Sequence, residues 1–267
     1  MILKRRVALN GIWMDEIDKR IVISSVEPED GKENITAVDA AGGYGQRITG
    51  NRRSTLDMVV TFRLLEHGRN VNGMTARGQL LEKVNAWAAA GGVLTVNYKP
   101  ERRLNVILVR APGEGSLWDY TKEFTLTFRA YRIPYWEDEM ITSVSAGENA
   151  NSGSGAATIG GSVKTQVSAM LENTSGMNIN TATVTIGGKT MNFSGLNMGN
   201  NEALIIDYSG DGILRIRIRS AGGSYRSAMA CRSDTSADEF TAIGDTGISF
   251  TAQRACRLTA SWRCRYL

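Results

Sequence analysis

Residues 122–137 read KEFTLTFRAYRIPYWE, and the first half of this stretch decides the fold class. Apolar residues stand at every second position from Phe124 to Ala130 and alternate with Thr and Arg. A period of two is typical of a half-buried β-strand, whereas the apolar positions of a helix recur every three to four residues. The stretch therefore predicts a strand with one face in a protein core.

Working outward from it, the sequence up to residue 138 adds further strands and one helix. Asn10-Gly11 predicts a tight hairpin, because both residues tolerate the positive φ angles of a type I′ turn. A helix is expected from Thr75 to Ala90, where apolar residues share one face and Gly91-Gly92 can end it. The remaining strands are expected at 6–9, 12–17, 56–64, 93–98, 104–110 and 123–132. The first half is thus predicted to be a β-sandwich with one packed helix.

Two segments lack such periodicity. Residues 27–51 are charged and Gly-rich, and they are expected to form a long loop or a weakly paired arm. Residues 141–161 are rich in Ser, Gly, Asn and Ala, a composition that cannot bury much apolar surface by itself. This second segment predicts a linker or long loop, and so two domains, 1–138 and 139–267.

The part after residue 161 shows no helical period and predicts a second, all-β domain. Its strands are expected at 162–171, 181–186, 189–193, 203–207, 213–219, 247–250 and 257–266. In the last of these, strict alternation places Cys256, Trp262 and Cys264 on one buried face. The two cysteines are expected to be reduced core residues, since free Cys packs as a small hydrophobe.

Composition excludes several classes of function. The 31 Lys and Arg residues against 27 Asp and Glu give a net charge of only +4, and they are scattered, so specific nucleic-acid binding is not expected. No apolar run reaches the ~18 residues of a membrane span, and no secretory signal is visible at the start. Synthesis in a cytosol is the expectation.

Catalytic, cofactor and metal sites are not predicted. His67 is the only histidine, and no nucleophile motif accompanies it, so it is expected in a solvated loop. Gly43–Gly50 lacks the ending of a phosphate-binding loop and is expected to be flexible. Asp207–Gly212 resembles the start of a calcium loop, but Ile218 stands where a bidentate glutamate is needed, which favours a β-turn. The acidic run Glu137–Glu139 is expected to be solvated.

Arginines line one face of two predicted strands, Arg215, Arg217 and Arg219 on one and Arg257, Arg263 and Arg265 on the other. Such a face could meet an anionic partner, although solvated strand faces often have this composition. Both interpretations stay open.

The segment from Trp118 to Glu137, with its FTLTFRAYR and PYWE portions, resembles the end of the first domain of phage distal tail proteins (Dit) from siphophages and related prophages. The Asn10-Gly11 hairpin, the strand at 56–64 and the single helix before LTVNY agree with that family in order. The close of the chain, from Gly247 to Leu267, is similar to the end of the family's galectin-like second domain.

The resemblance implies a non-enzymatic structural protein of the virion tail tip, made in the bacterial host cytoplasm. It implies that the first domain forms a homohexameric ring around the tail channel and that the second, a galectin-like or jelly-roll β-sandwich, projects outward. The implied partners are the tail tube protein, the tape measure protein, the tail-tip hub or tail-associated lysin, and receptor-binding proteins. The ring would thereby connect the tail tube to the tail fibre or receptor-binding apparatus.

Two other functions stay open. A carbohydrate-binding module for host adhesion would need exposed aromatic rings, for which Tyr208 and Tyr225 are the candidates outside the terminal strand. A tail-tip hydrolase would need an acid-base pair that the sequence does not show.

Overall fold

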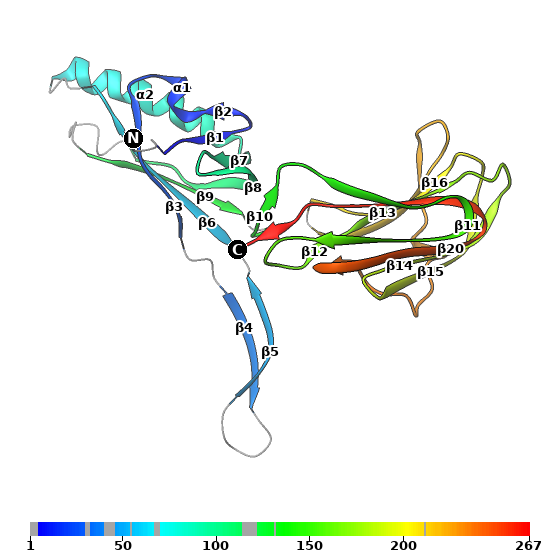
Figure 1. The fold of residues 1–267 in the computed structure, drawn as a ribbon. Helices are drawn as coiled ribbons and strands as arrows, with labels where there is room; N and C mark the ends of the chain where they lie inside the picture. The colour runs from blue at the N-terminus through cyan, green and yellow to red at the C-terminus, as the bar shows by residue number, and fades with distance from the viewer. Residues whose placement is uncertain are drawn as a thin grey trace. The chain divides into compact units, whose positions relative to one another are not determined.

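The computed structural model describes residues 5–29, 33–39, 46–53, 55–66, 70–113, 122–130, 132–210 and 212–267, with the backbone alone for 33–39 and 46–53. The chain separates into two compact units, Met1–Trp136 and Glu137–Leu267. Both consist mainly of antiparallel β-strands, which confirms the predicted fold class (Figure 1). The predicted domains 1–138 and 139–267 remain predictions as independent folding units.

The first unit is built on one antiparallel sheet with the strand order β2-β1-β7-β8-β9-β6-β3. Strands β6 and β9 lie side by side near its centre, with Met58 opposite Phe128 and Phe62 opposite Phe124. In both strands the alternate residues are buried, as their period of two predicts. The bounds are β1 (Val7–Leu9), β2 (Ile12–Trp13), β3 (Ile21–Glu29), β6 (Leu56–Leu64), β7 (Gly92–Val96), β8 (Lys99–Arg110) and β9 (Phe124–Ala130).

The hairpin predicted at Asn10-Gly11 is confirmed, with φ angles of 53° and 82° at the two turn residues. Its second strand is shorter than predicted, because β2 ends at Trp13 and a one-turn helix, α1 (Met14–Ile17), follows. The prediction of a strand up to Ile17, and of a single helix in this half, is therefore wrong. Met14 is buried while Asp15 and Glu16 stand in the acidic first turn, so this turn anchors one side chain without extending the sheet.

The long helix α2 (Val71–Ala89) begins four residues before the predicted Thr75. Its N-cap is Asn70, whose side-chain oxygen accepts a hydrogen bond from the Gly73 N–H at 2.9 Å. The predicted end is confirmed, since Gly91 follows with a φ angle of 59°, the left-handed conformation that glycine tolerates. The helix buries Leu80, Leu81, Val84 and Ala88.

Residues 27–51 are more regular than predicted. Glu27–Glu29 completes β3, and β4 (Glu33–Asp39) pairs with β5 (Gln46–Arg53) in a two-stranded antiparallel sheet. In the described part of the chain neither strand pairs with any other, which agrees with a weakly paired arm rather than a loop. Gly43–Gly45 lie outside the described residues, but from Gln46 onward the expected flexible loop is a strand.

The second unit is all-β, as predicted. Its main sheet follows the order β15-β14-β20-β13-β16-β17-β18, and β11 pairs with β20. The bounds are β11 (Thr142–Ile159), β12 (Thr165–Gln166), β13 (Ser168–Asn173), β14 (Ile179–Ile186), β15 (Lys189–Met198), β16 (Ala203–Tyr208), β17 (Leu214–Arg219), β18 (Tyr225–Ser227), β19 (Thr241–Ala242), β20 (Gly244–Trp262) and β21 (Arg265–Tyr266), with a 3-10 turn η2 (Met229–Cys231) and the short strand β10 (Trp136–Asp138) where the two units meet in sequence.

The linker predicted at 141–161 is wrong, because almost all of this segment is strand β11. It pairs antiparallel with β20 from Thr142 opposite Trp262 to Ile159 opposite Gly244, with irregularities between Ala146 and Ser152. The pairing satisfies the backbone of a segment whose own side chains bury little. Composition alone therefore misidentified a strand that is stabilised by its neighbour.

Strands β11 and β20 both fold over near their middles, so each contributes to two layers of a sandwich (Figure 1). One part of β20 pairs with β14 from Ile248 to Ala252, and the other pairs with β13 from Cys256 to Ser261. At the fold of β11 two glycines are required, since a Cβ on Gly153 would lie 2.6 Å from the Cα of Gly147 and 2.7 Å from the Phe250 ring. Glycine thus permits the close approach of the two layers at this end.

The terminal segment confirms its predicted faces. Cys256, Leu258, Ala260, Trp262 and Cys264 are all buried in the core of the second unit. Cys256 and Cys264 are free thiols, as predicted.

Candidate functional site

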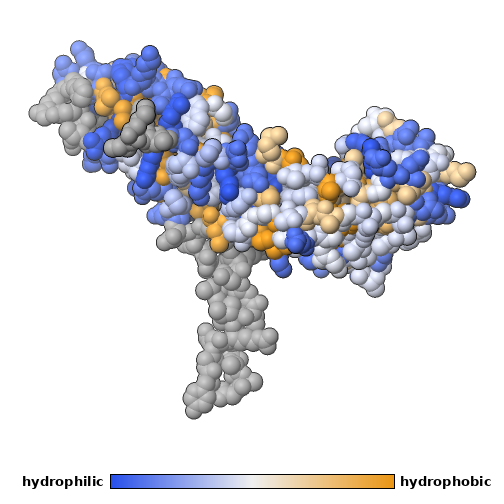
Figure 2. All heavy atoms as spheres, in the orientation of Figure 1, coloured by the Kyte–Doolittle hydropathy of each residue, from blue (hydrophilic) through white to orange (hydrophobic). Residues whose placement is uncertain are grey.

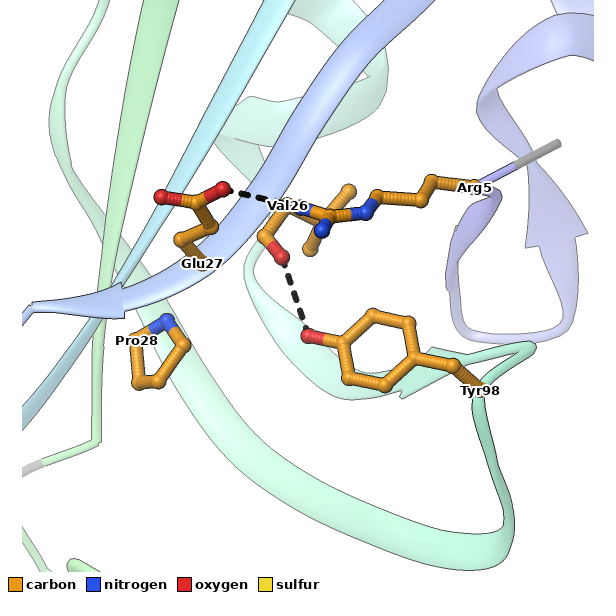
Figure 3. Close-up of a pocket in the computed structure, with 5 residues that line it drawn as sticks. All are labelled: Arg5, Val26, Glu27, Pro28 and Tyr98. Atoms are coloured by element: carbon orange, nitrogen blue, oxygen red, sulfur yellow. Dashed lines mark hydrogen bonds and ion pairs between the residues drawn. The ribbon is translucent and has the colours of Figure 1, made fainter.

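One pocket of about 540 Å³ lies on the first unit and is lined by Arg5, Val26, Glu27, Pro28 and Tyr98 (Figure 3). The Tyr98 hydroxyl donates a hydrogen bond to the backbone carbonyl of Val26 at 3.0 Å. Across the pocket the Arg5 guanidinium and the Glu27 carboxylate form an ion pair at 2.9 Å. These residues come from the start of the chain, from β3 and from the turn between β7 and β8. No single local motif in the sequence therefore predicts the pocket.

The chemistry of this pocket does not resemble a catalytic site. Burial raises the pKa of the Tyr98 phenol, so the hydroxyl stays protonated and serves as a donor. Arg5 and Glu27 are both largely exposed, and an exposed ion pair of this kind neutralises charge with little effect on stability.

Strand β8 exposes apolar side chains on one face. Leu104 and Val106 are buried, whereas Ile107 and Val109 are 44% and 41% exposed. Ile107 stands opposite Arg129, which forms a bidentate pair with Asp57 at 2.7 and 2.6 Å. An apolar centre next to satisfied charges is the arrangement found in protein interfaces.

Two arginines of the β17 face share one carboxylate. Arg215 and Arg217 both contact the carboxylate of Asp207 on β16, at 3.1 and 2.6 Å. The Arg217 guanidinium also lies 4.6 Å from the centre of the Tyr225 ring. On the terminal strands, Arg257 pairs with Glu172 at 2.6 Å. The β17 face thus carries more arginines than the one carboxylate that pairs with them, so both interpretations of it stay open.

The acidic run Glu137–Glu139 was predicted to be solvated, and for Glu137 this prediction is wrong. Glu137 is only 6% exposed and forms an ion pair with Arg265 at 3.2 Å, and Arg265 also donates to the Gln166 side chain at 3.1 Å. The Arg263 guanidinium donates to the backbone carbonyls of Asp138 and Glu139. This run therefore secures the end of the chain in the second unit, because β21 supplies the arginine that Glu137 needs.

The remaining candidates give no site in the described residues. His67 and Asp211 lie outside them. After β16 the chain turns, and the Ser209 N–H donates a hydrogen bond to the carbonyl of Ile213 at 2.9 Å, consistent with the predicted β-turn. No group of three or more metal-ligating side chains occurs in the described part of the chain, and none of its helices is long and apolar enough to cross a membrane.

Comparison with solved structures identifies proteins that share this fold. No protein-family model matches the chain, and no curated protein sequence matches it significantly. Among solved structures, the chain has the fold of phage tail hub proteins. It is similar to the Dit protein of phage SPP1, described as a paradigm of the hub adsorption apparatus in phages that infect Gram-positive bacteria. That match has a TM-score of 0.66 at 12% identity and covers 98% of this chain and 99% of the SPP1 protein.

A chain of the phage P2 baseplate in its activated conformation is also similar, with a TM-score of 0.47 at 8% identity over 99% of this chain and 98% of that chain. The match to the SPP1 protein confirms, at the level of the fold, the resemblance to distal tail proteins predicted from the sequence.

Proposed function

We propose that this protein is a non-enzymatic structural subunit of a phage tail tip. The observation that carries the proposal is the fold match to the SPP1 Dit protein along nearly the whole length of both chains. Both units take part in this match. The exposed apolar side chains of β8 agree with a protein that works through contact surfaces.

In this proposal the first unit forms a homohexameric ring that connects the tail tube to the receptor-binding apparatus. Its assembly partners are the tail tube protein, the tape measure protein, the tail-tip hub or tail-associated lysin, and receptor-binding proteins. The chain is synthesised in the bacterial host cytoplasm and located in the virion tail tip. Exposed Ile107 and Val109 support a subunit contact, since apolar surface on a strand face favours burial by a neighbour. In a closed ring each subunit offers a different patch to its neighbour.

The test is light scattering and negative-stain electron microscopy of the full chain across concentration, alone and with neighbouring tail proteins. The variant Ile107→Asp with Val109→Asp should prevent ring formation without lowering the melting temperature, because both side chains are exposed. The control is Met177→Asp with Ile213→Asp, two more exposed apolar residues of the second unit. A chain that stays monomeric under every condition, or rings that tolerate the Ile107 and Val109 changes, would contradict the proposal.

The carbohydrate-binding alternative depends on Tyr225. Tyr208 is less accessible for sugar stacking, because it is partly buried and its hydroxyl is fixed by hydrogen bonds with the carbonyl and the N–H of Phe240, at 3.1 and 2.6 Å. Tyr225 is 53% exposed, but Arg217 covers one face of its ring. A glycan array with the full chain and with Tyr225→Ala separates the two functions.

A further inference from the structure

Charge is unevenly distributed within the second unit. Residues 137–267 contain 11 Lys and Arg residues against 12 Asp and Glu residues, so this part of the chain is close to neutral. One side of its main sheet nevertheless carries twice as many arginines as carboxylates, and we call this surface the arginine face. It is formed by β20, β13, β16, β17 and β18, and its charged side chains are Arg215, Arg217, Arg219, Arg257, Asp207 and Glu172. The other charged residues of the unit are mainly acidic, so positive charge is concentrated on this face.

The pairing of the strands places these side chains on the solvent side of the sheet. Ile216 and Ile218, which alternate with the arginines of β17, are fully buried, so the arginines point the other way. Residues directly opposite each other in a ladder share a face, and Arg217 is opposite Ile205, which is opposite Met170. Both of these apolar side chains are only partly buried. Figure 2 shows strongly hydrophilic residues on the surface of the second unit where Figure 1 places β16. The face thus has an apolar centre bordered by arginines.

The guanidinium groups of β17 are held in place but not neutralised. Asp207 accepts hydrogen bonds from Nε and Nη2 of Arg215, both at 3.1 Å, and from Nη2 of Arg217 at 2.6 Å, so one carboxylate serves two cations. The contact with the Tyr225 ring further restricts the Arg217 guanidinium. The Arg219 side chain has no hydrogen bond or ion pair with any residue that the structure describes. Cations that are already ordered lose little freedom when an anion binds, so this arrangement favours an anionic partner.

Two features favour a polypeptide with carboxylates over a phosphate polymer. The contact of Asp207 with two guanidinium groups shows that a carboxylate fits between arginines spaced as they are on this strand. Met170 and Ile205 would stay open to water under a phosphodiester chain, which has few apolar groups, whereas a polypeptide can cover them with an apolar side chain. Arg, Tyr and Met are also enriched in protein interfaces, and Tyr225, at the edge of the face, is 53% exposed.

We propose that the arginine face binds an acidic segment of another protein, with carboxylates against Arg215 and Arg219 and an apolar side chain over Met170 and Ile205. Charge complementarity selects the partner and directs its approach, and the apolar centre adds buried surface. The proposal goes beyond the role of the chain as a tail-tip subunit and does not depend on ring formation by the first unit.

The binding test uses the full chain and labelled synthetic probes in fluorescence anisotropy. The acidic probe is a short peptide with two Leu residues between clusters of Asp and Glu. A neutral peptide has Asn and Gln in place of Asp and Glu, another peptide has Ser in place of Leu, and a single-stranded oligonucleotide of the same charge represents a phosphate polymer. The acidic probe should bind about tenfold or more tightly than the neutral peptide, and its affinity should fall as salt is added.

Replacement of Leu by Ser in the probe should weaken binding about threefold or more, because the apolar contact is lost. Equal binding of the acidic and neutral peptides, or no binding of the acidic probe, overturns the proposal. Equally tight binding of the Ser peptide or of the oligonucleotide also overturns it, because either result would indicate a general attraction of anions to the face.

Variants of the full chain locate the binding surface. Arg215→Gln with Arg219→Gln removes two positive charges and leaves the ion pair of Arg217 in place. This variant should keep the melting temperature of the wild type, while its affinity for the acidic probe falls about tenfold or more. The control, Lys164→Gln with Lys189→Gln, removes the same charge from the same unit outside the arginine face and should bind the probe like the wild type. If the arginine variant binds the probe as tightly as the control, the proposal fails.

Two further measurements distinguish charge from folding and a foreign partner from a second copy. Arg215→Lys with Arg219→Lys keeps the charge and should recover most of the affinity that the Gln variant loses. A loss as large as that of the Gln variant would count against charge complementarity and overturn the proposal. Sedimentation of the wild type and the Gln variant across concentration should give the same assembly state for both. Association that only the wild type shows would make a second copy the occupant of the face and would also overturn the proposal.

Discussion

Strands β9 and β11 are both antiparallel members of their sheets, but they are stabilised in different ways. In β9, Phe124, Leu126 and Phe128 are buried, so the strand brings its own apolar surface to the core. In the 18 residues of β11 only Ala146 and Ile159 are buried. Strand β11 depends on backbone pairing with β20 and on close approach to side chains that β20 supplies. A strand can thus be secured by what it buries or by what its neighbour places against it.

The largest effect that distinguishes the two strands is expected at Phe128. Its side chain is fully buried and meets Trp87 edge-on, with ring centres 6.0 Å apart. Phe128→Ala should lower the free energy of unfolding of the first unit by about 3–5 kcal/mol, through lost burial and the cavity left behind. Denaturant unfolding followed by Trp fluorescence measures this.

The control for Phe128 is Thr127→Ala, on the opposite face of the same strand, where the loss should be small. Equal losses at the two positions would show that β9 is not secured by its buried face, and the contrast with β11 would disappear.

For β11 the sensitive position is a glycine rather than a large residue. Gly153→Ala adds a Cβ 2.6 Å from the backbone of Gly147, which must then shift. Overpacking of this kind should lower the free energy of unfolding by about 1–3 kcal/mol. Gly247→Ala is the matched change in β20, because nothing lies within 4 Å of its added Cβ. Similar melting temperatures for the two variants would mean that the layers do not meet closely at Gly153.

The same contrast explains how far the sequence could predict the structure. Strands β6 and β9 were predictable because the alternation of apolar and polar residues in their sequences shows which side chains are buried. Strand β11 was not, because its stability comes from β20, about a hundred residues further along the chain. The start of α2 was missed since Val71 in its first turn is exposed, although Asn70 carried the N-cap signal.

The contact surfaces were harder to predict than the core. The exposed apolar face of β8 corresponds to apolar residues at both odd and even positions of the strand, Leu104 and Val106 against Ile107 and Val109. The pocket was not visible, because residues from Arg5 to Tyr98 meet only after folding. Nor did the sequence show that Arg215 and Arg217 of β17 pair with Asp207, because Asp207 lies on the neighbouring strand β16.

A third prediction concerns pH at the fold of β11, where Cys256 stands opposite Ala150. Burial raises the pKa of the Cys256 thiol to about 12, whereas an unfolded thiol ionises near ~8.5. Between these values the unfolded state binds fewer protons, so the free energy of unfolding falls as pH rises through this window, by up to ~1.4 kcal/mol per pH unit. Below it the thiol is protonated in both states and contributes no slope.

The measurement is denaturant unfolding at a series of alkaline pH values for the wild type and for Cys256→Ala. The variant should show a shallower alkaline loss, while the two curves should run parallel below pH ~8. Buried Tyr208 titrates in the same region but is present in both proteins, so the difference between them isolates the thiol. Identical alkaline slopes would indicate that water reaches Cys256 in the folded state, and that the bend in the middle of β11 does not close over this thiol.

The smallest effect is expected from side chains that join β11 to β20 at the surface. The Thr158 hydroxyl donates to the Asp245 carboxylate at 2.8 Å, and both groups are exposed. If backbone pairing secures the strand, Thr158→Ala should lower the free energy of unfolding by less than ~1 kcal/mol, because water replaces an exposed hydrogen bond readily. Thr142→Ala, at the other end of β11, serves as the control for lost β-propensity. The difference between these two variants isolates the hydrogen bond. A loss above ~2 kcal/mol at Thr158 alone would exceed the usual contribution of such a bond and would place the stability of β11 in its side chains, as in β9.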